Sequence, residues 1–271
     1  MLEMLVVPLR YGFFVAALFV GAATALIAAL LGTHLTFKGF SMIGDGLSHV
    51  GFGTIAIAVA LGAAPLQVAV PVVVLTAVLL LSVKRKLTDA AADSSVAMLS
   101  AAGLAAGVIA VSLAGTNFDL NSYLFGSVLA VGEEEVVPIL MLCAVIFAVY
   151  LVCYPAFFAL TFDEEFFEAK THKATLFRAL LASLAAACVV VGMQSVGALL
   201  ISALLIFPPS AAKHLARSFR GTVVLAGVFS VLCFVVGLFL SYHLSLPAGG
   251  AVVLTNAALY LVCLLFGKLK K

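Results

Sequence analysis

The sequence predicts an all-α, polytopic membrane protein with eight or nine transmembrane helices, and its composition and hydropathy pattern support this prediction. Of its 271 residues, 65% are hydrophobic and only 10% are charged, and the mean hydropathy is +1.30. Apolar stretches of about 20 residues, the length that an α-helix needs to cross the hydrocarbon core, recur along the whole chain. The alternating strands typical of a membrane β-barrel do not occur. We therefore expect a single transmembrane domain over residues 1–271.

Nine apolar runs define the expected helices. In chain order they cover residues 11–32, 43–62, 65–83, 94–114, 136–160, 176–194, 196–211, 221–241 and 248–267. The first run is too long for the apolar region of a cleavable signal peptide. The seventh run is short and ends at Pro208-Pro209, so a partial span is an alternative for this run and the expected count is eight or nine.

Positively charged residues indicate the orientation of the chain. If the nine runs alternate across the membrane, Lys and Arg gather on one side, at positions 38, 84–86, 170, 173, 178, 213, 217, 220, 268, 270 and 271, and Arg10 falls on the other side. Loops rich in Lys and Arg stay in the cytoplasm. We therefore expect the N-terminus outside and the C-terminus inside.

The candidate metal site is formed by Asp45 and His49, which stand four residues apart at the head of the second run. This spacing places both side chains on one face of a helix. An acid inside a membrane span is costly and indicates a functional site, and carboxylate with imidazole is a ligand pair suited to Zn²⁺, Mn²⁺ or Fe²⁺. The alternative is an Asp–His hydrogen bond that joins two helices. Two ligands do not complete a metal shell.

Four further residues are expected along the pathway of the ion. Loop 115–135 carries Asp119 and three glutamates without Lys or Arg, and such an acidic loop attracts cations; its stretch 120–131 is apolar enough to re-enter the membrane. Gln194 and Ser195 are expected at an outer turn, where a hydrated loop tip is the alternative, and His243 at an outer helix end. His34, at the end of the first run, is expected to be solvated.

The segment Phe207–Arg220 predicts a short amphipathic cytoplasmic helix after a proline break. Pro208 and Pro209 are expected to end the span, and Ser210 to cap the helix that follows. Basic residues then recur at helical spacing, at Lys213, His214, Arg217 and Arg220. Composition alone leaves two roles open, a helix lying at the lipid interface or a docking helix for a cytoplasmic partner. The chain has no phosphate-binding loop for ATP and no zinc-protease or nucleophile-elbow motif.

With these segments identified, the chain resembles the ABC-3 family, the membrane permeases of bacterial zinc, manganese and iron ABC importers. The resemblance covers nearly the whole chain and rests on motifs in family order: Phe40–Gly51 (FSMIGDGLSHVG), Asp119–Val131 (DLNSYLFGSVLAV), Phe162–Lys170 (FDEEFFEAK), Val191–Ala212 (VGMQSVGALLISALLIFPPSAA) and Leu238–Gly249 (LFLSYHLSLPAG). The last motif departs from the common family pattern, because His243 and Ser245 stand where a tyrosine and an acid are usual.

The resemblance implies a homodimeric permease in the bacterial cytoplasmic membrane, with ATP hydrolysed by two separate cytoplasmic subunits and metal delivered by an extracytoplasmic binding protein. It also implies that Asp45 and His49 contact the metal and that the segment after Pro208-Pro209 docks on the ATPase. The expected function is import of a divalent transition metal by alternating access, with zinc slightly favoured over manganese and iron, and the metal is cargo rather than a cofactor. The chain itself is not expected to be an enzyme or to bind nucleic acid. The alternatives are a proton-coupled secondary transporter and a permease for a metal chelate such as cobalamin or a siderophore.

Overall fold

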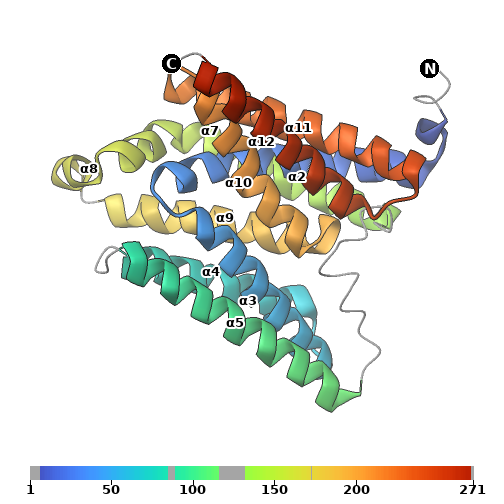
Figure 1. The fold of residues 1–271 in the computed structure, drawn as a ribbon. Coiled ribbons are helices and arrows are strands. Elements are labelled where there is room, and N and C mark those ends of the chain that lie inside the picture. The colour runs from blue at the N-terminus through green and yellow to red at the C-terminus, as the bar shows by residue number, and fades with distance from the viewer. Residues whose placement is uncertain (1–6, 85–88, 116–131, 172, 270–271) are drawn as a thin grey trace.

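The structure, a computed structural model, describes residues 7–84, 89–115, 132–171 and 173–269, and all regular structure in these ranges is helical (Figure 1). Among the described residues, nine helices are long and apolar enough to cross a membrane, which confirms the predicted fold class. They are α2 (Gly12–Phe37), α3 (Ser41–Ala60), α4 (Pro65–Lys84), α5 (Asp89–Ala114), α7 (Glu133–Phe162), α9 (Ala174–Val196), α10 (Ala198–Leu215), α11 (Phe219–Leu244) and α12 (Ala248–Leu269). Two short helices, η1 (Pro8–Arg10) and α8 (Glu164–Lys170), complete the described chain.

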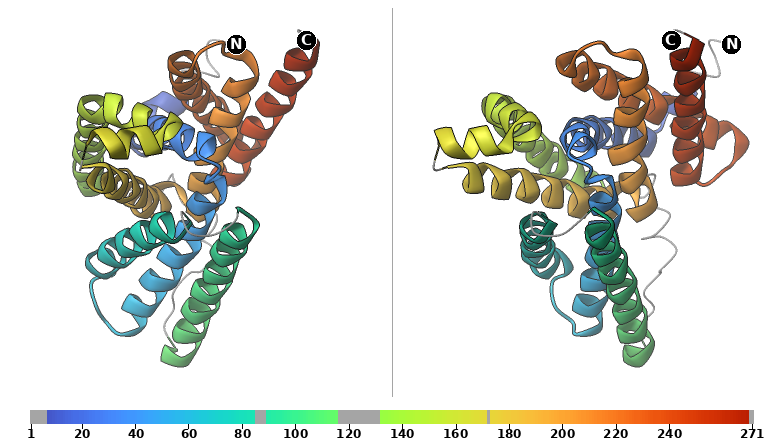
Figure 2. Two further views of the ribbon diagram at one scale, coloured as in Figure 1. Left: turned by 90° about the vertical axis from the view of Figure 1, so that its left-hand side faces the viewer. Right: turned by 60° about the vertical axis from the view of Figure 1, so that its left-hand side comes forward.

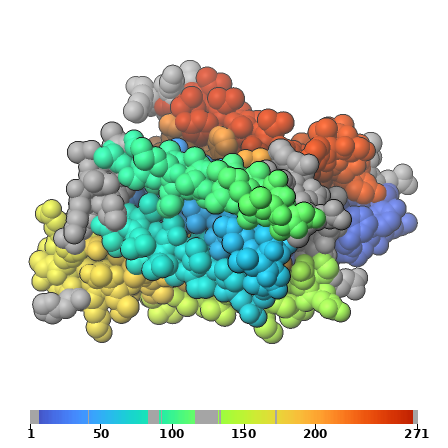
Figure 3. Space-filling model, turned by 90° about the horizontal axis from the view of Figure 1, so that it is seen from below, coloured from blue at the N-terminus to red at the C-terminus, as the bar shows by residue number. Residues whose placement is uncertain are grey.

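The helices form two groups. Helices α3, α4 and α5 make a layer that lies apart from the remaining helices in Figures 1 and 2, and α3 packs on both of the others. Figure 3 shows this layer from below, with α5 in green beside the α3–α4 pair. The layer is joined to the larger group where α4 packs on α9 and where α3 packs on α9 and α10.

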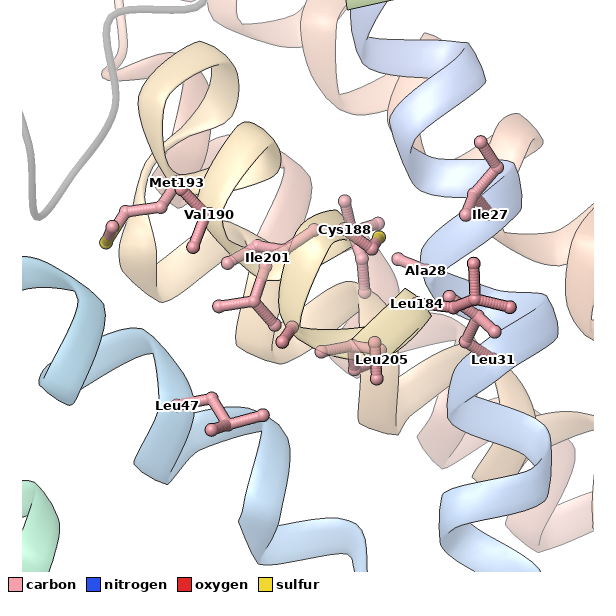
Figure 4. Close-up of a cluster of buried hydrophobic side chains, with 14 of the residues drawn as sticks. Ile27, Ala28, Leu31, Leu47, Leu184, Cys188, Val190, Met193, Ile201 and Leu205 are labelled. Atoms are coloured by element: carbon pink, nitrogen blue, oxygen red, sulfur yellow. The ribbon is translucent and has the colours of Figure 1, made fainter. Parts of the chain in front are cut away.

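The core lies between α2, α9 and α10, whose spans are the most buried together with that of α3. Figure 4 shows this core, where Leu31 of α2 lies opposite Leu184 of α9 and where Leu205 of α10 lies between these helices and α3. Lipid is as apolar as leucine, so helices associate in a membrane mainly through close packing. The outer faces of α4, α5 and α7 expose large apolar side chains, as a lipid environment requires.

A single residue, Gly197, separates α9 from α10. Its φ of 98° lies in the region that only glycine adopts without strain, and its N–H donates to the carbonyl groups of Gly192 and Met193, which end α9. The seventh predicted run is therefore a separate helix of 18 residues, about 27 Å long and close to the roughly 30 Å thickness of the hydrocarbon core.

The predicted break at Pro208-Pro209 is wrong, because α10 continues through both prolines to Leu215. Proline at position 209 leaves the carbonyl of Leu205 without its helical donor. Helix α2 shelters this carbonyl, since a Cβ built on Gly32 would lie only 2.1 Å from the Leu205 oxygen. The freed carbonyl therefore lies against the backbone of α2 rather than against lipid.

The predicted cap of the following helix is also wrong. Ser210 lies inside α10, and the serine that caps a helix in this segment is Ser218, whose Oγ accepts a 3.2 Å hydrogen bond from the N–H of Gly221 at the start of α11. The segment 208–220 thus comprises the last two turns of α10, a short turn at 216–218 and the first residues of α11. The structure places no separate amphipathic helix there among the residues it describes.

Candidate functional site

Asp45 and His49 project from one face of α3, one turn apart, as their spacing predicts. The His49 Nε2 lies 3.7 Å from an Asp45 carboxylate oxygen, and the two side chains are 20% and 39% exposed. This distance is too long for a hydrogen bond. The His49 Nδ1 is buried and has no hydrogen-bond partner among the described residues. Neither nitrogen of the ring is therefore committed to a structural contact.

The two side chains open onto a cavity of about 250 Å³ between α3 and α5. On α3 the cavity is lined by Met42, Asp45 and His49. On α5 it is lined by Val96, Ala97, Ser100, Ala101 and Leu104. The Ser100 hydroxyl donates to the carbonyl of Val96 at 2.8 Å, so its oxygen can still accept. The lining thus combines polar groups that can accept with apolar side chains, which suits a small cation with bound water.

Glycines set the close approach of α3 and α5. A Cβ on Gly53 would lie 2.1 Å from the carbonyl oxygen of Gly103, and one on Gly107 would lie 2.7 Å from the Cα of Gly53. Small residues at such crossings let two backbones touch. This contact lies one to two helical turns from His49. It therefore fixes the distance between α3 and α5, which form the walls of the cavity.

A hydrogen bond between helices is present beside the pair, but it belongs to Ser48. The hydroxyl groups of Ser48 in α3 and Ser202 in α10 are 3.0 Å apart, and each also lies within hydrogen-bond distance of a carbonyl of its own helix. Because a hydroxyl has one proton, one serine donates to the other across the helices and the other donates to its own carbonyl. Since Asp45 and His49 share one helix and are not hydrogen-bonded to each other, the alternative of an Asp–His bond joining two helices loses its support. Ser48 supplies that link instead.

The pair can provide two ligands to a metal. Typical metal–oxygen and metal–nitrogen bonds of about 2.1 Å place two ligands of a tetrahedral ion about 3.4 Å apart, close to the observed 3.7 Å. No cluster of three or more His, Cys, Asp or Glu side chains able to hold a metal exists within the described ranges. The arrangement is thus an incomplete shell, which suits an ion that must leave again.

The other predicted pathway residues do not line this cavity. Gln194 and Ser195 lie in the last turn of α9 rather than in a loop; Gln194 is exposed, while the buried Ser195 donates to the carbonyl of Val191. His243 is exposed in the last turn of α11, with its ring against Tyr242. Asp119 lies outside the described residues, so its role stays a prediction.

The basic end of α10 packs against its neighbours. The Lys213 ammonium lies 5.1 Å from the centre of the Phe37 ring, and the His214 ring lies 5.8 Å from that of Tyr260 in α12. Arg217, in the turn that follows, is exposed. These contacts tie the segment to α2 and α12, so a force on this turn would reach both helices.

Sequence reasoning missed an ion-pair cluster at the same end of the molecule. Lys38 bonds Glu164 at 2.7 Å, and Arg178 bonds both Glu164 and Glu168, the latter at 2.5 Å. Burial lowers the pKa of the Lys38 ammonium, and its bond to Glu164 opposes that shift. Burial alone would raise the pKa of Glu164, but Lys38 and Arg178 outweigh it and hold this pKa below its usual value.

The expectation that His34 is solvated is wrong. Because α2 continues to Phe37, the ring lies inside the helix bundle and is fully buried. Its Nδ1 lies 2.8 Å from the Thr161 hydroxyl and its Nε2 lies 3.0 Å from the Tyr150 hydroxyl, both in α7. The signal that could have revealed it is the polar Thr161 in an otherwise apolar span, which needs a partner in lipid.

Comparisons with known proteins agree with the fold and with the predicted motifs. A family model described as the ABC 3 transport family matches residues 10–267. The chain is 28% identical to the chelated iron transport system membrane protein YfeC of Yersinia pestis, over 98% of this chain and 90% of that protein. It is 27% identical to the manganese transport system membrane protein MntB of Synechocystis, over 96% of this chain and 85% of that protein.

A solved structure supports the same conclusion. The structure of PsaBC from Streptococcus pneumoniae in complex with Fab has a TM-score of 0.85 and 27% identity to this chain, and the match covers 96% of this chain and 94% of that one. The resemblance inferred from the motifs is thereby confirmed. The protein belongs to the ABC 3 transport family, as a multi-pass membrane permease of a bacterial ATP-binding-cassette importer in which separate chains hydrolyse ATP.

Proposed function

We propose that this chain carries a divalent transition metal ion into the cytoplasm and that Asp45 and His49 bind the ion on its way. The observation that carries this proposal is the pair itself, two uncommitted ligands 3.7 Å apart on a cavity inside a membrane span. A carboxylate within a membrane span is costly unless a partner compensates its charge. A passing dication is such a partner, and the incomplete shell lets it leave.

The sequence slightly favours zinc, whereas the relatives favour manganese or iron. YfeC is named for chelated iron and MntB for manganese, and the ligand pair accepts all three metals. We therefore place manganese and iron first. The cavity of about 250 Å³ is smaller than the usual pocket for a drug-sized molecule, about 300–1,000 Å³, which favours a bare or hydrated ion over a bulky chelate.

The mechanism proposed is alternating access in a dimer of this chain with two ATPase subunits inside and a binding protein outside. The segment from Lys213 to Arg217 is the proposed contact with the ATPase, because it is basic and partly exposed. It ends α10 and leads into α11, so movement of this turn is transmitted directly to two spans. Closure of the ATPase subunits would change which side of the site is open.

Metal uptake into liposomes tests the proposal. The permease, its ATPase partner and the binding protein are reconstituted with ATP inside, and uptake of radioactive manganese, iron and zinc is measured. We expect Asp45→Ala and His49→Ala each to lower uptake by about tenfold or more, while the complex still assembles. Asp93→Asn, which removes an exposed carboxylate of α5 outside the cavity, should leave uptake unchanged.

Two results would contradict the proposal. If both alanine variants transport all three metals at the normal rate, the site is wrong. If uptake needs a proton gradient and ignores ATP with its ATPase, the chain works as a secondary transporter. Competition among the three metals at equal concentration then ranks the cargo, and a preference for zinc would restore the ranking that the sequence favours.

A further inference from the structure

A second hollow lies on the outside of the bundle, between α2, α7 and α11. It has a volume of about 670 Å³ and shares no residue with the cavity at Asp45 and His49. Helices α7 and α11 both pack on α2 but hardly on one another. Where they do meet, the Phe219 ring of α11 lies 5.4 Å from the Phe158 ring and 5.1 Å from the Phe162 ring of α7. These rings join the two helices next to Arg220, which follows Phe219 in α11 and lines the groove.

The groove has the length of one lipid leaflet. Its lining on α11 runs from Arg220 to Leu232, a separation of twelve residue steps or about 18 Å along the helix axis. Half of the hydrocarbon core is about 15 Å. Gly227 lets α11 pack closely on α2 at the base of the groove, since a Cβ there would lie 3.0 Å from the Leu26 side chain. An extended acyl chain therefore matches the groove in length.

The groove is apolar along its length and charged at one end. Among its described lining residues, Arg220 carries the one charge, and the remaining side chains are aliphatic or aromatic. The Tyr150 hydroxyl is turned inward to His34 at 3.0 Å. The Tyr154 hydroxyl lies close to the Arg220 guanidinium, shielded from solvent and without a hydrogen bond of good geometry. Arg220 is thus the exposed donor at this end, and the Tyr154 hydroxyl lies behind it.

The charge at that end of the groove is positive, and the neighbouring sequence contains no acidic residue. Residues 207–246, which include the whole of α11, contain no Asp or Glu, while Arg220 of the lining is exposed. In the orientation that the Lys and Arg residues predict, this end faces the cytoplasmic leaflet. That leaflet carries anionic lipids, and basic pockets between helices on this side bind their headgroups. Arginine also bonds phosphate in a bidentate manner.

We propose that the groove between α2, α7 and α11 binds one anionic phospholipid, with its phosphate on Arg220 and one acyl chain along α11. The fit of charge, length and apolar lining carries this proposal, and it does not depend on the metal or on the function proposed above. A second copy of this chain covering the groove is the competing occupant, and the experiment below separates the two.

Native mass spectrometry of the purified chain tests the site without metal or ATP. The protein is exchanged into detergent with equal amounts of phosphatidylglycerol and phosphatidylcholine of the same acyl chains, and retained lipid is counted. We expect one retained phosphatidylglycerol per chain. Arg220→Gln should lower its retention relative to phosphatidylcholine by about fivefold, and Arg217→Gln, which removes an exposed arginine outside the lining, should not.

Two further variants complete the test. Tyr154→Phe, which removes the hydroxyl behind Arg220, should weaken the preference without changing charge, which covers the case in which Arg220→Gln fails to fold. Val228→Phe, which fills the groove at an exposed position of its lining, should lower retention of both lipids. Equal retention of the two headgroups by the unmodified chain, or equal losses in Arg217→Gln and Arg220→Gln, would overturn the proposal. So would disulfide formation between two chains carrying Val228→Cys, because the groove would then face a second copy.

Discussion

His34 shows how one buried side chain joins two spans. The Thr161 hydroxyl already donates to the carbonyl of Phe157 at 2.7 Å, so it accepts from the ring at Nδ1. The Nε2 is then the acceptor for the Tyr150 hydroxyl. A neutral imidazole satisfies one donor and one acceptor of α7 in this way. The ring thus fixes α7 against α2 within the bundle.

Removal of this ring should therefore destabilise the protein. His34→Ala leaves a cavity and a buried Tyr150 hydroxyl without its acceptor, so we expect a loss of about 3 kcal/mol, measured as a lower unfolding temperature in detergent. The double variant His34→Ala with Tyr150→Phe should lose less than the sum of the two single variants, because the second change removes the unpaired hydroxyl. Strictly additive losses would contradict this account of the hydrogen bonds.

The two histidines differ in how far the sequence reveals them. The placement of His49 beside Asp45 follows from spacing on one helix, and it was predicted correctly. The environment of His34 depends on Thr161, which is 127 residues away, and on the end of α2, where the hydropathy pattern did not assign the five residues 33–37 to the span. A helix end depends on capping and packing. An error of a few residues in the predicted end of α2 therefore led to the wrong prediction that His34 is in solvent.

Among the helices, α3 and α5 depend on backbone contact at Gly53. An added Cβ would lie 2.1 Å from the Gly103 oxygen, and backbone cannot rotate away as a side chain can. Gly53→Ala should separate the two helices, cost about 2 kcal/mol and weaken metal uptake, because the walls of the cavity move apart. Gly250→Ala is the matched control, since nothing lies within 4 Å of its Cβ. Equal stability of the two variants would mean that α3 and α5 do not need the close approach.

The short helix α8 depends on its ion pairs. Glu164 bonds both Lys38 and Arg178, whose side chains are each only 8% exposed. Glu164→Gln leaves these two buried cations with Glu168 alone, so we expect a loss of about 2 kcal/mol in the free energy of unfolding. Glu165→Gln, an exposed neighbour in α8, should cost almost nothing.

Acid should act on the same contacts. Because the pKa of Glu164 lies below its ordinary value of 4.5, its carboxylate stabilises the fold fully above that value and loses this effect as the pH falls through the lower pKa of the folded state. The difference in unfolding temperature between Glu164→Gln and the unmodified chain should therefore be largest at neutral pH and vanish in strong acid. A constant difference over that range would contradict an ionised Glu164.

The pattern of apolar runs was sufficient to predict these nine helices, but not their contacts. Each run gives a length and a mean hydropathy, and nine of nine appear as helices among the described residues. The predicted break at Pro208 was wrong because α10 continues through both prolines while it packs on Gly32 of α2, a contact that the segment alone does not reveal. The cluster at Glu164 was missed for the same reason, since Lys38 lies 126 residues away. The hydropathy pattern describes one helix at a time, whereas these features depend on contacts between two helices.

At the scale of the whole molecule, orientation decides what the Asp45–His49 pair does. Asp45 lies four residues after the start of α3 at Ser41, about 6 Å along the helix. The Lys and Arg residues predict that this end faces the cytoplasm. An ion at the pair has then crossed most of the bilayer, and the pair acts as an inner site. In the opposite orientation it would be an entrance.

Cysteine labelling measures this orientation directly. The native cysteines give little background, because Cys143, Cys188, Cys233 and Cys263 are buried and Cys153 is half-buried. Ala63→Cys places a thiol in the exposed turn between α3 and α4, and Arg217→Cys places one in the turn between α10 and α11. With the N-terminus outside, a membrane-impermeant maleimide should label Ala63→Cys in intact cells and Arg217→Cys only after permeabilisation. The reverse pattern would make the pair an outer site and would place Arg220 in the outer leaflet, because both conclusions depend on which side the positive residues occupy.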